Sequence, residues 1–108
     1  MNNVFGVGAE SNWVPTRGVQ QSDLTIGDSV VQLIDGAAFA EKTRAVLVSI
    51  EDAPVRMTWD DSDPVGGSHG HRWVAGTVLR MHKEAARMAK FIRDGASDAT
   101  ATITEFTY

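Results

Sequence analysis

The densest group of potential ligands in the sequence is an acidic cluster. Residues 60–63 read Asp-Asp-Ser-Asp, and two glycines follow at Gly66 and Gly67. Clustered carboxylates on a flexible loop are typical calcium ligands, but the glycine at position six and the glutamate at position twelve of an EF-hand loop are missing. Asp and Ser side chains also bond the backbone of ordinary turns. We therefore predict a solvated turn and no metal site.

Three histidines, His69, His71 and His82, supply the imidazole groups of the chain. In an extended strand, residues two apart point to the same side, so His69 and His71 could bind one ion together. A zinc site needs three or four ligands in tetrahedral geometry, and the sequence indicates no fourth one. We expect neither a metal ion nor another cofactor.

Catalytic motifs are also missing from the sequence. Ser68 precedes His69, but the Gly-x-Ser-x-Gly pattern of a nucleophile elbow is absent. The glycine-rich stretch at residues 66–70 lacks the Gly-Lys-[Ser/Thr] ending of a phosphate-binding loop. We therefore expect no catalytic residues and a protein that is not an enzyme.

Two tryptophans, Trp59 and Trp73, flank the segment that carries these acids and histidines. Both could stack on sugars in a carbohydrate-binding sandwich, because ligand sites are commonly lined by aromatic rings. Trp59 is in phase with Val55 and Met57, which predicts instead that it belongs to the core. For Trp73 the two interpretations remain open.

The elements that must position these side chains are predicted to be strands. Residues 44–50 are rich in β-branched side chains, residues 51–54 contain turn formers, and residues 55–59 alternate between apolar and polar. This order predicts a β-hairpin. A turn-rich loop over residues 60–70 follows, and extended structure resumes at Trp73.

The rest of the chain adds further strands and little helix. Residues 98–108 alternate so that Ala99, Ala101 and Ile103 face one side, which is typical of a half-buried antiparallel strand. Residues 83–90 favour one or two helical turns, or a strand begins at Ala89. About seven or eight short strands predict an all-β fold, an antiparallel β-sandwich or a jelly-roll-like small barrel with at most a short helix. The other expected strands are residues 22–26, 29–34 and 76–82.

The N-terminal segment differs from the rest because it lacks periodicity. Residues 1–21 hold two isolated large aromatics, Phe5 and Trp13. We expect an extended N-terminal arm over residues 1–21 and a β-sandwich domain over residues 22–108. The arm is either a plain disordered terminus or a segment that folds on a partner with the two aromatics as anchors. Phe5, Trp13 and Trp73 are thus the predicted partner-binding residues.

Composition narrows the classes of function. A chain of 108 residues fits one domain, and it has no cysteine for disulfides or thiolate metal sites. The formal net charge of −4 argues against a general nucleic-acid binder. No apolar run approaches the roughly 18–20 residues of a membrane helix, and the start does not resemble a secretory signal. We therefore expect no nucleic-acid partner and no membrane association.

Two stretches carry a resemblance to a known class of proteins. An apolar strand leads into Ala-Pro-Val-Arg-Met-Thr-Trp-Asp at residues 53–60, and Asp-Pro, Gly-His and Ala-Gly follow; the second stretch is Gly-Ala-Ser-Asp-Ala-Thr at residues 95–100. This pattern resembles small β-proteins encoded among the structural genes of tailed bacteriophages. It covers roughly residues 24–108, whereas the segment before Gln20 matches no part of it.

The resemblance implies a virion structural protein, a capsid cement or decoration protein or a related head or tail accessory protein. Its partners would be the major capsid protein and neighbouring copies of itself in a homo-oligomer. It would lie on the surface of the phage head after synthesis in the bacterial cytoplasm. The alternative is a carbohydrate- or host-surface-binding sandwich on the virion that uses Trp73 and the loop of residues 60–71.

Overall fold

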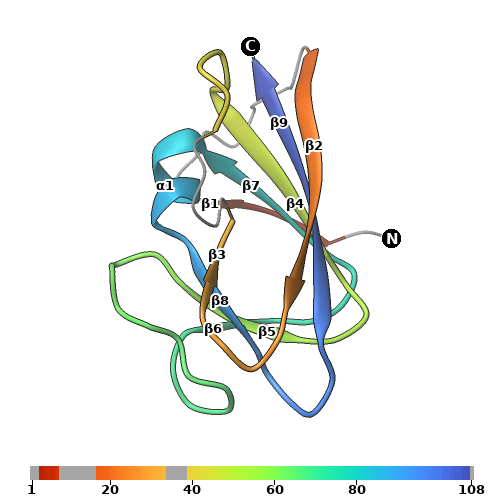
Figure 1. Ribbon diagram of the computed structural model, residues 1–108, viewed down its shortest axis with the longest axis vertical. Helices are drawn as coiled ribbons and strands as arrows, with labels where there is room; N and C mark the ends of the chain where they lie inside the picture. The colour runs from red at the N-terminus through yellow and green to blue at the C-terminus, as the bar shows by residue number, and fades with distance from the viewer. Residues whose placement is uncertain (1–2, 8–16, 34–38, 108) are drawn as a thin grey trace.

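The computed structural model describes residues 3–7, 17–33 and 39–107, which form two packed β-sheets and one short helix (Figure 1). The expected all-β sandwich is confirmed. The larger sheet, sheet A, contains in spatial order β1 (Asn3–Val7), β7 (Thr77–His82), β4 (Ala45–Glu51), β9 (Ala99–Thr107) and β2 (Arg17–Ile26). The smaller sheet, sheet B, contains β3 (Val31–Gln32), β8 (Lys90–Arg93), β5 (Val55–Thr58) and β6 (His71–Trp73).

Alternating apolar side chains of both sheets form the core. In β4, Val46, Val48 and Ile50 are buried, and in β5 the buried residues are Val55 and Met57. Successive side chains of a strand point to opposite faces, so each strand contributes its apolar set to the space between the sheets. The period-two pattern therefore sets which face of each sheet is internal.

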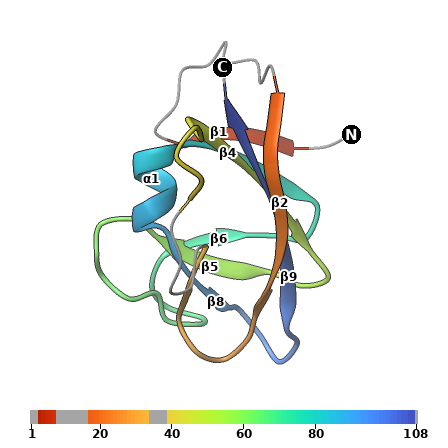
Figure 2. The same cartoon turned by 45° about the horizontal axis from the view of Figure 1, so that its top comes forward.

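The last strand follows its predicted pattern closely. Ala99, Ala101 and Ile103 are buried and the intervening threonines are half-buried. β9 pairs with β4 on one side and with β2 on the other, and β2 and β9 lie side by side in both views (Figure 1 and Figure 2). A strand with two partners and one buried face needs this alternation.

The expected hairpin of residues 44–59 is wrong. β4 pairs with β7 and β9 in sheet A, whereas β5 pairs with β6 and β8 in sheet B. Asp52 adopts a positive φ of 75° and Ala53 is buried, so the chain dips into the core and enters the opposite sheet. A turn sequence with Pro54 fits this sheet-to-sheet connection as well as it fits a hairpin. The residues on either side of Gly27 also separate into the two sheets, as β2 and β3.

Both interpretations of residues 83–93 are present, one after the other. Helix α1 (Lys83–Met88) buries Ala86, and β8 begins at Lys90 after the buried Ala89. The helix lies on the opposite side of the sandwich from β2 and β9 (Figure 2). No helix in the described part of the chain is long and apolar enough to cross a membrane.

Two described parts of the expected arm, residues 3–7 and 17–21, belong to strands of sheet A. β1 pairs in parallel with β7, with Phe5 opposite Leu79, and β2 begins at Arg17 and continues along β9. Both described parts of this segment therefore extend the edges of sheet A. An edge strand is held by backbone pairing, which requires no alternation of side chains. Trp13 and the side chain of Phe5 lie outside the described part of the structure.

Candidate functional site

A pocket of about 450 Å³ lies where β5 ends and β6 begins. The two strands are neighbours in sheet B, with Met57 opposite His71, and the loop of residues 59–70 connects them. The loop, green in Figure 1, extends from one side of the sandwich. Because both ends of the loop start from paired strands, the residues at its two ends face each other. The pocket is lined by Met57, Thr58, Trp59, Asp60, His69, Gly70 and His71.

Three aromatic rings form a row along this edge of sheet B. The centroids of Trp59 and His71 are 4.9 Å apart with an interplanar angle of 24°, and those of His71 and Trp73 are 6.1 Å apart at 19°. β6 is an edge strand, so the row is incompletely covered: His71 is exposed, and the two tryptophans are half-buried against the core. We call Trp59, His71 and Trp73 the ring row.

The structure shows how the two tryptophans pack. Trp59 packs against the core as expected, but it follows the last residue of β5 and is less buried than Val55 and Met57. Trp73 also packs against the core while it stacks with His71. Each tryptophan thus combines a packing role with a position beside the pocket.

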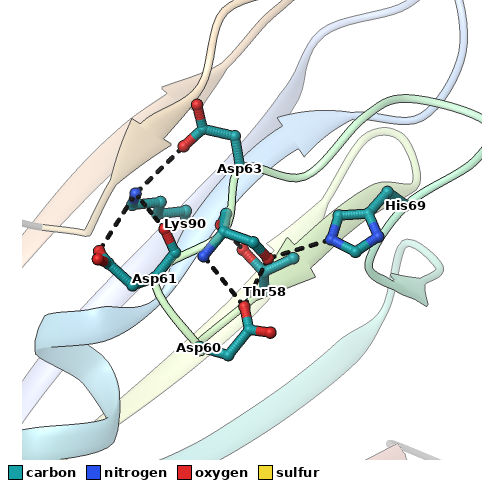
Figure 3. A network of polar contacts seen from close by, with 7 residues as sticks. Thr58, Asp60, Asp61, Asp63, His69 and Lys90 are labelled. Carbon is teal, nitrogen blue, oxygen red and sulfur yellow. Dashed lines mark hydrogen bonds and ion pairs between the residues drawn. The ribbon is translucent and has the colours of Figure 1, made fainter.

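The acidic end of the loop is folded around its own side chains (Figure 3). Oδ1 of Asp60 accepts hydrogen bonds from the backbone N–H and the hydroxyl of Ser62. These two bonds lower the pKa of Asp60 below its ordinary value of 3.8. The Ser62 hydroxyl also lies 3.1 Å from Nε2 of His69. Since the serine proton goes to the carboxylate, Nε2 of His69 is the donor of that contact.

The Asp60, Ser62 and His69 contacts differ from those of a catalytic triad. A nucleophilic serine donates its proton to the imidazole, and the carboxylate bonds the other ring nitrogen. Here the serine donates to the carboxylate and accepts from the imidazole. The two hydrogen bonds of Ser62 therefore hold Asp60 and His69 in place at the pocket.

The remaining acids of the cluster bind a lysine of the neighbouring strand. Nζ of Lys90 lies 3.1 Å from Oδ1 of Asp63 and 3.6 Å from Oδ1 of Asp61, and it donates to the Asp61 carbonyl oxygen at 3.1 Å (Figure 3). The hydrogen bond to Asp63 raises the pKa of Lys90 above 10.5. Within residues 3–7, 17–33 and 39–107, no three side chains of ligand type form a group that could hold a metal ion.

Asp94, like Lys90, holds the loop of residues 59–70 against sheet B, and no pattern in the sequence singled it out. Its side chain is 7% exposed and accepts hydrogen bonds from Nε of Arg72 at 2.7 Å and from the backbone N–H of Gly67, and it forms an ion pair with Arg56 at 3.3 Å. Burial raises the pKa of Asp94, but these contacts outweigh it and hold the pKa below 3.8. Asp94 precedes Gly95, and an Asp-Gly pair is typical of a turn but does not indicate contacts with distant arginines.

Gly70 sets how closely the loop approaches β5. Its φ is +108°, and a Cβ there would lie 2.9 Å from the carbonyl oxygen of Met57. Only glycine combines this φ with so close a contact. Arg56 donates to the Gly70 carbonyl at 3.1 Å and secures the same approach.

A buried carboxylate elsewhere was also missed. Glu105 is 2% exposed, and its Oε1 accepts from the backbone N–H of Ala40 at 2.8 Å and from the Thr43 hydroxyl at 2.7 Å. Glu105 continues the phase of Ala101 and Ile103, so the alternation of β9 could have placed it inside. It ties the segment before β4 to sheet A and lies apart from the pocket.

The structure brings together only some of the residues that the sequence indicated. His69 and His71 both line the pocket, whereas His82 ends β7 in the other sheet. Of the expected partner-binding residues, Trp73 belongs to the ring row and Phe5 lies on the edge strand β1 of sheet A.

The arrangement offers a tryptophan ring, one charged acceptor and two imidazoles around an open pocket, which is the composition of a binding site. In comparisons with known proteins, no family model, no curated protein and no solved structure matches the chain.

Proposed function

We propose that this protein is a virion structural protein of a tailed bacteriophage, a cement or decoration protein that binds across capsid subunits on the surface of the head. The sequence support is the resemblance of residues 53–60 and 95–100 to small phage β-proteins. The structural observation that carries the proposal is the long open edge of sheet A. The partners would be the major capsid protein and neighbouring copies of this chain.

The open edge belongs to β2. This strand runs for ten residues and pairs with β9 on one side, and no strand among the described residues pairs with its other side. Monomeric proteins protect long edges with charges, prolines, bulges or short strands. A bulge between Gly18 and Gln20 interrupts one end, but residues 21–25 contain one charge, Asp23, and no proline.

An edge of this kind supports docking by strand addition. The unpaired backbone N–H and C=O groups can pair with an extended segment of a neighbour, which supplies affinity through main-chain hydrogen bonds. Repetition of the contact over a symmetric shell gives avidity without strong single contacts. The contacts of Asp60, Ser62 and His69 support the same structural, non-enzymatic role, because the serine proton points to the carboxylate.

Blocking the edge tests the proposal. Ser22 is opposite Ile103, whose side chain is buried, so Ser22 faces the inner side of the edge strand although it is exposed. An inward-pointing charge at this position opposes strand pairing. We expect Ser22→Lys to lower occupancy on phage particles that lack the native copy by roughly tenfold, equivalent to about 1.4 kcal/mol.

Ser97→Lys is the matched control, because it makes the same change in the exposed turn between β8 and β9. We expect this control to keep its occupancy, and both variants to keep the melting temperature of the parent. Equal occupancy of the two variants would reject docking through β2. Failure of the parent protein to bind any particle component would reject the virion role itself.

A further inference from the structure

The pocket beside the ring row offers an aromatic surface to a ligand. Trp59 and His71 both line it, and the rings of the row are nearly parallel, with interplanar angles of 24° and 19°. Met57 also lines the pocket, although its side chain is fully buried in the core. The face of an aromatic ring carries negative charge density, which favours contact with the weakly positive C–H groups of a flat ligand.

Two polar residues of the pocket, Asp60 and His69, can accept hydrogen bonds from a ligand. Asp60 uses Oδ1 for its bonds to Ser62 (Figure 3), and the two oxygens of a carboxylate together can accept further hydrogen bonds. His69 donates from Nε2 to Ser62, so Nδ1 is the ring nitrogen that can accept a hydrogen bond. A ligand that fits both groups must bring hydrogen-bond donors together with an apolar face.

The acceptors are held in place before any ligand arrives. The bonds from Ser62 fix Asp60, and the loop that carries both residues is fastened to β8 by Lys90 through Asp61 and Asp63. Preorganised groups lose little freedom on binding, so even a small ligand can be held. The volume of about 450 Å³ lies within the range of small-molecule pockets.

We propose that this pocket binds a carbohydrate, with one pyranose ring placed against Trp59 and its hydroxyl groups donating to Asp60 and His69. A sugar ring has an apolar C–H face and a rim of hydroxyl donors, which matches the rings and the acceptors. An organic ammonium group fits less well, because parallel rings do not form the converging walls that enclose a cation. The site is independent of the open edge of sheet A.

The test is direct binding of the purified full-length protein to an array of hexose-containing oligosaccharides. The strongest glycan on the array is then titrated while tryptophan fluorescence is followed. We expect saturable binding that Asp60→Asn weakens about tenfold and Trp59→Ala weakens tenfold or more. Trp59→Phe keeps an aromatic face and should recover most of the affinity.

Asp23→Asn is the control for the lost charge, since Asp23 is an exposed carboxylate on β2, away from the pocket; it should bind like the parent. Thermal melting of each variant separates loss of the site from loss of the fold. The proposal is overturned if no glycan binds, or if Asp60→Asn and a folded Trp59→Ala both bind the selected glycan as tightly as the parent. It is also overturned if tetramethylammonium binds the pocket more tightly than any glycan.

This outcome is separable from the virion role. Asp60→Asn leaves β2 unchanged, so particles should take up this variant as they take up the parent. Loss of glycan binding with full occupancy would assign recognition of sugars to the pocket and docking to the edge strand.

Discussion

Asp94 joins three segments that are distant in the sequence. It begins the turn after β8, and its carboxylate contacts Arg56 of β5, Arg72 of β6 and the backbone of Gly67 in the loop. The side chain therefore holds the second half of the loop against the outer face of sheet B. Removing its charge should loosen the loop while the core stays packed.

We expect Asp94→Asn to lower the free energy of unfolding at pH 7 by about 1–2 kcal/mol, because the carboxylate is buried but its arginine partners are partly exposed. The pKa of Asp94 is lowered in the folded state, so its stabilisation is full above about pH 4, the range of an unfolded aspartate, and is lost as the pH falls through the folded value. Denaturant unfolding from pH 7 to pH 2 should show the variant and the parent converging in acid.

Asp28→Asn, which changes an exposed carboxylate in the turn after β2, controls for the loss of one charge. A constant difference between Asp94→Asn and the parent from pH 7 to pH 2 would contradict the assigned role.

For single residues, the sequence predicted the contacts that a side chain makes with its close neighbours in the chain. The bonds from Ser62 to Asp60 are those of an ordinary turn, as expected from the Asp-Asp-Ser-Asp sequence. Arg72 and Asp94 are 22 positions apart, and no local pattern indicates that they meet. The ring row escaped prediction for the same reason, because it depends on the register of β5 with β6.

Among the elements, the contact between the loop and β5 depends on one glycine. Gly70→Ala places a Cβ against the backbone of Met57, whereas Gly67→Ala places one in open space at a similarly positive φ. Both variants carry the cost of a left-handed residue, about 1–2 kcal/mol. We expect Gly70→Ala to lower the free energy of unfolding by roughly 1–3 kcal/mol more than Gly67→Ala does, because the added Cβ overpacks the contact. Urea denaturation of the two variants measures this difference. Equal losses would mean that the loop moves away from β5 without penalty.

The strands themselves were largely predictable, but their partners were not. The turn residues between β4 and β5 indicated where β4 ends and β5 begins, since the apolar alternation ends at Glu51 and resumes at Val55. Whether such a turn closes a hairpin or carries the chain to the other sheet depends on Ala53 entering the core. That choice is made by the packing of the two sheets, and the sequence of residues 44–59 alone does not specify this packing.

On the scale of the whole molecule, the N-terminal residues complete sheet A. Deleting residues 1–7 removes β1 and leaves the edge of β7 unpaired. We expect the free energy of unfolding to fall by about 1 kcal/mol, which for a domain of this size lowers the melting temperature by roughly 4–8 °C. Light scattering should also rise, because an uncovered edge promotes aggregation.

A shorter deletion that ends before Asn3 is the control and should behave like the parent. An unchanged melting temperature for both deletions would indicate instead that the segment is a separate arm.

The position of β9 constrains how the chain can be made. β9 lies between β4 and β2 in sheet A, yet it comes after every other strand in sequence. On the ribosome, β4 can pair with β7 once β7 has emerged, but β2 has no partner among the described strands until β9 follows. Joining β2 to the rest of sheet A is therefore a late step that depends on contacts distant in sequence, the kind that makes folding slow.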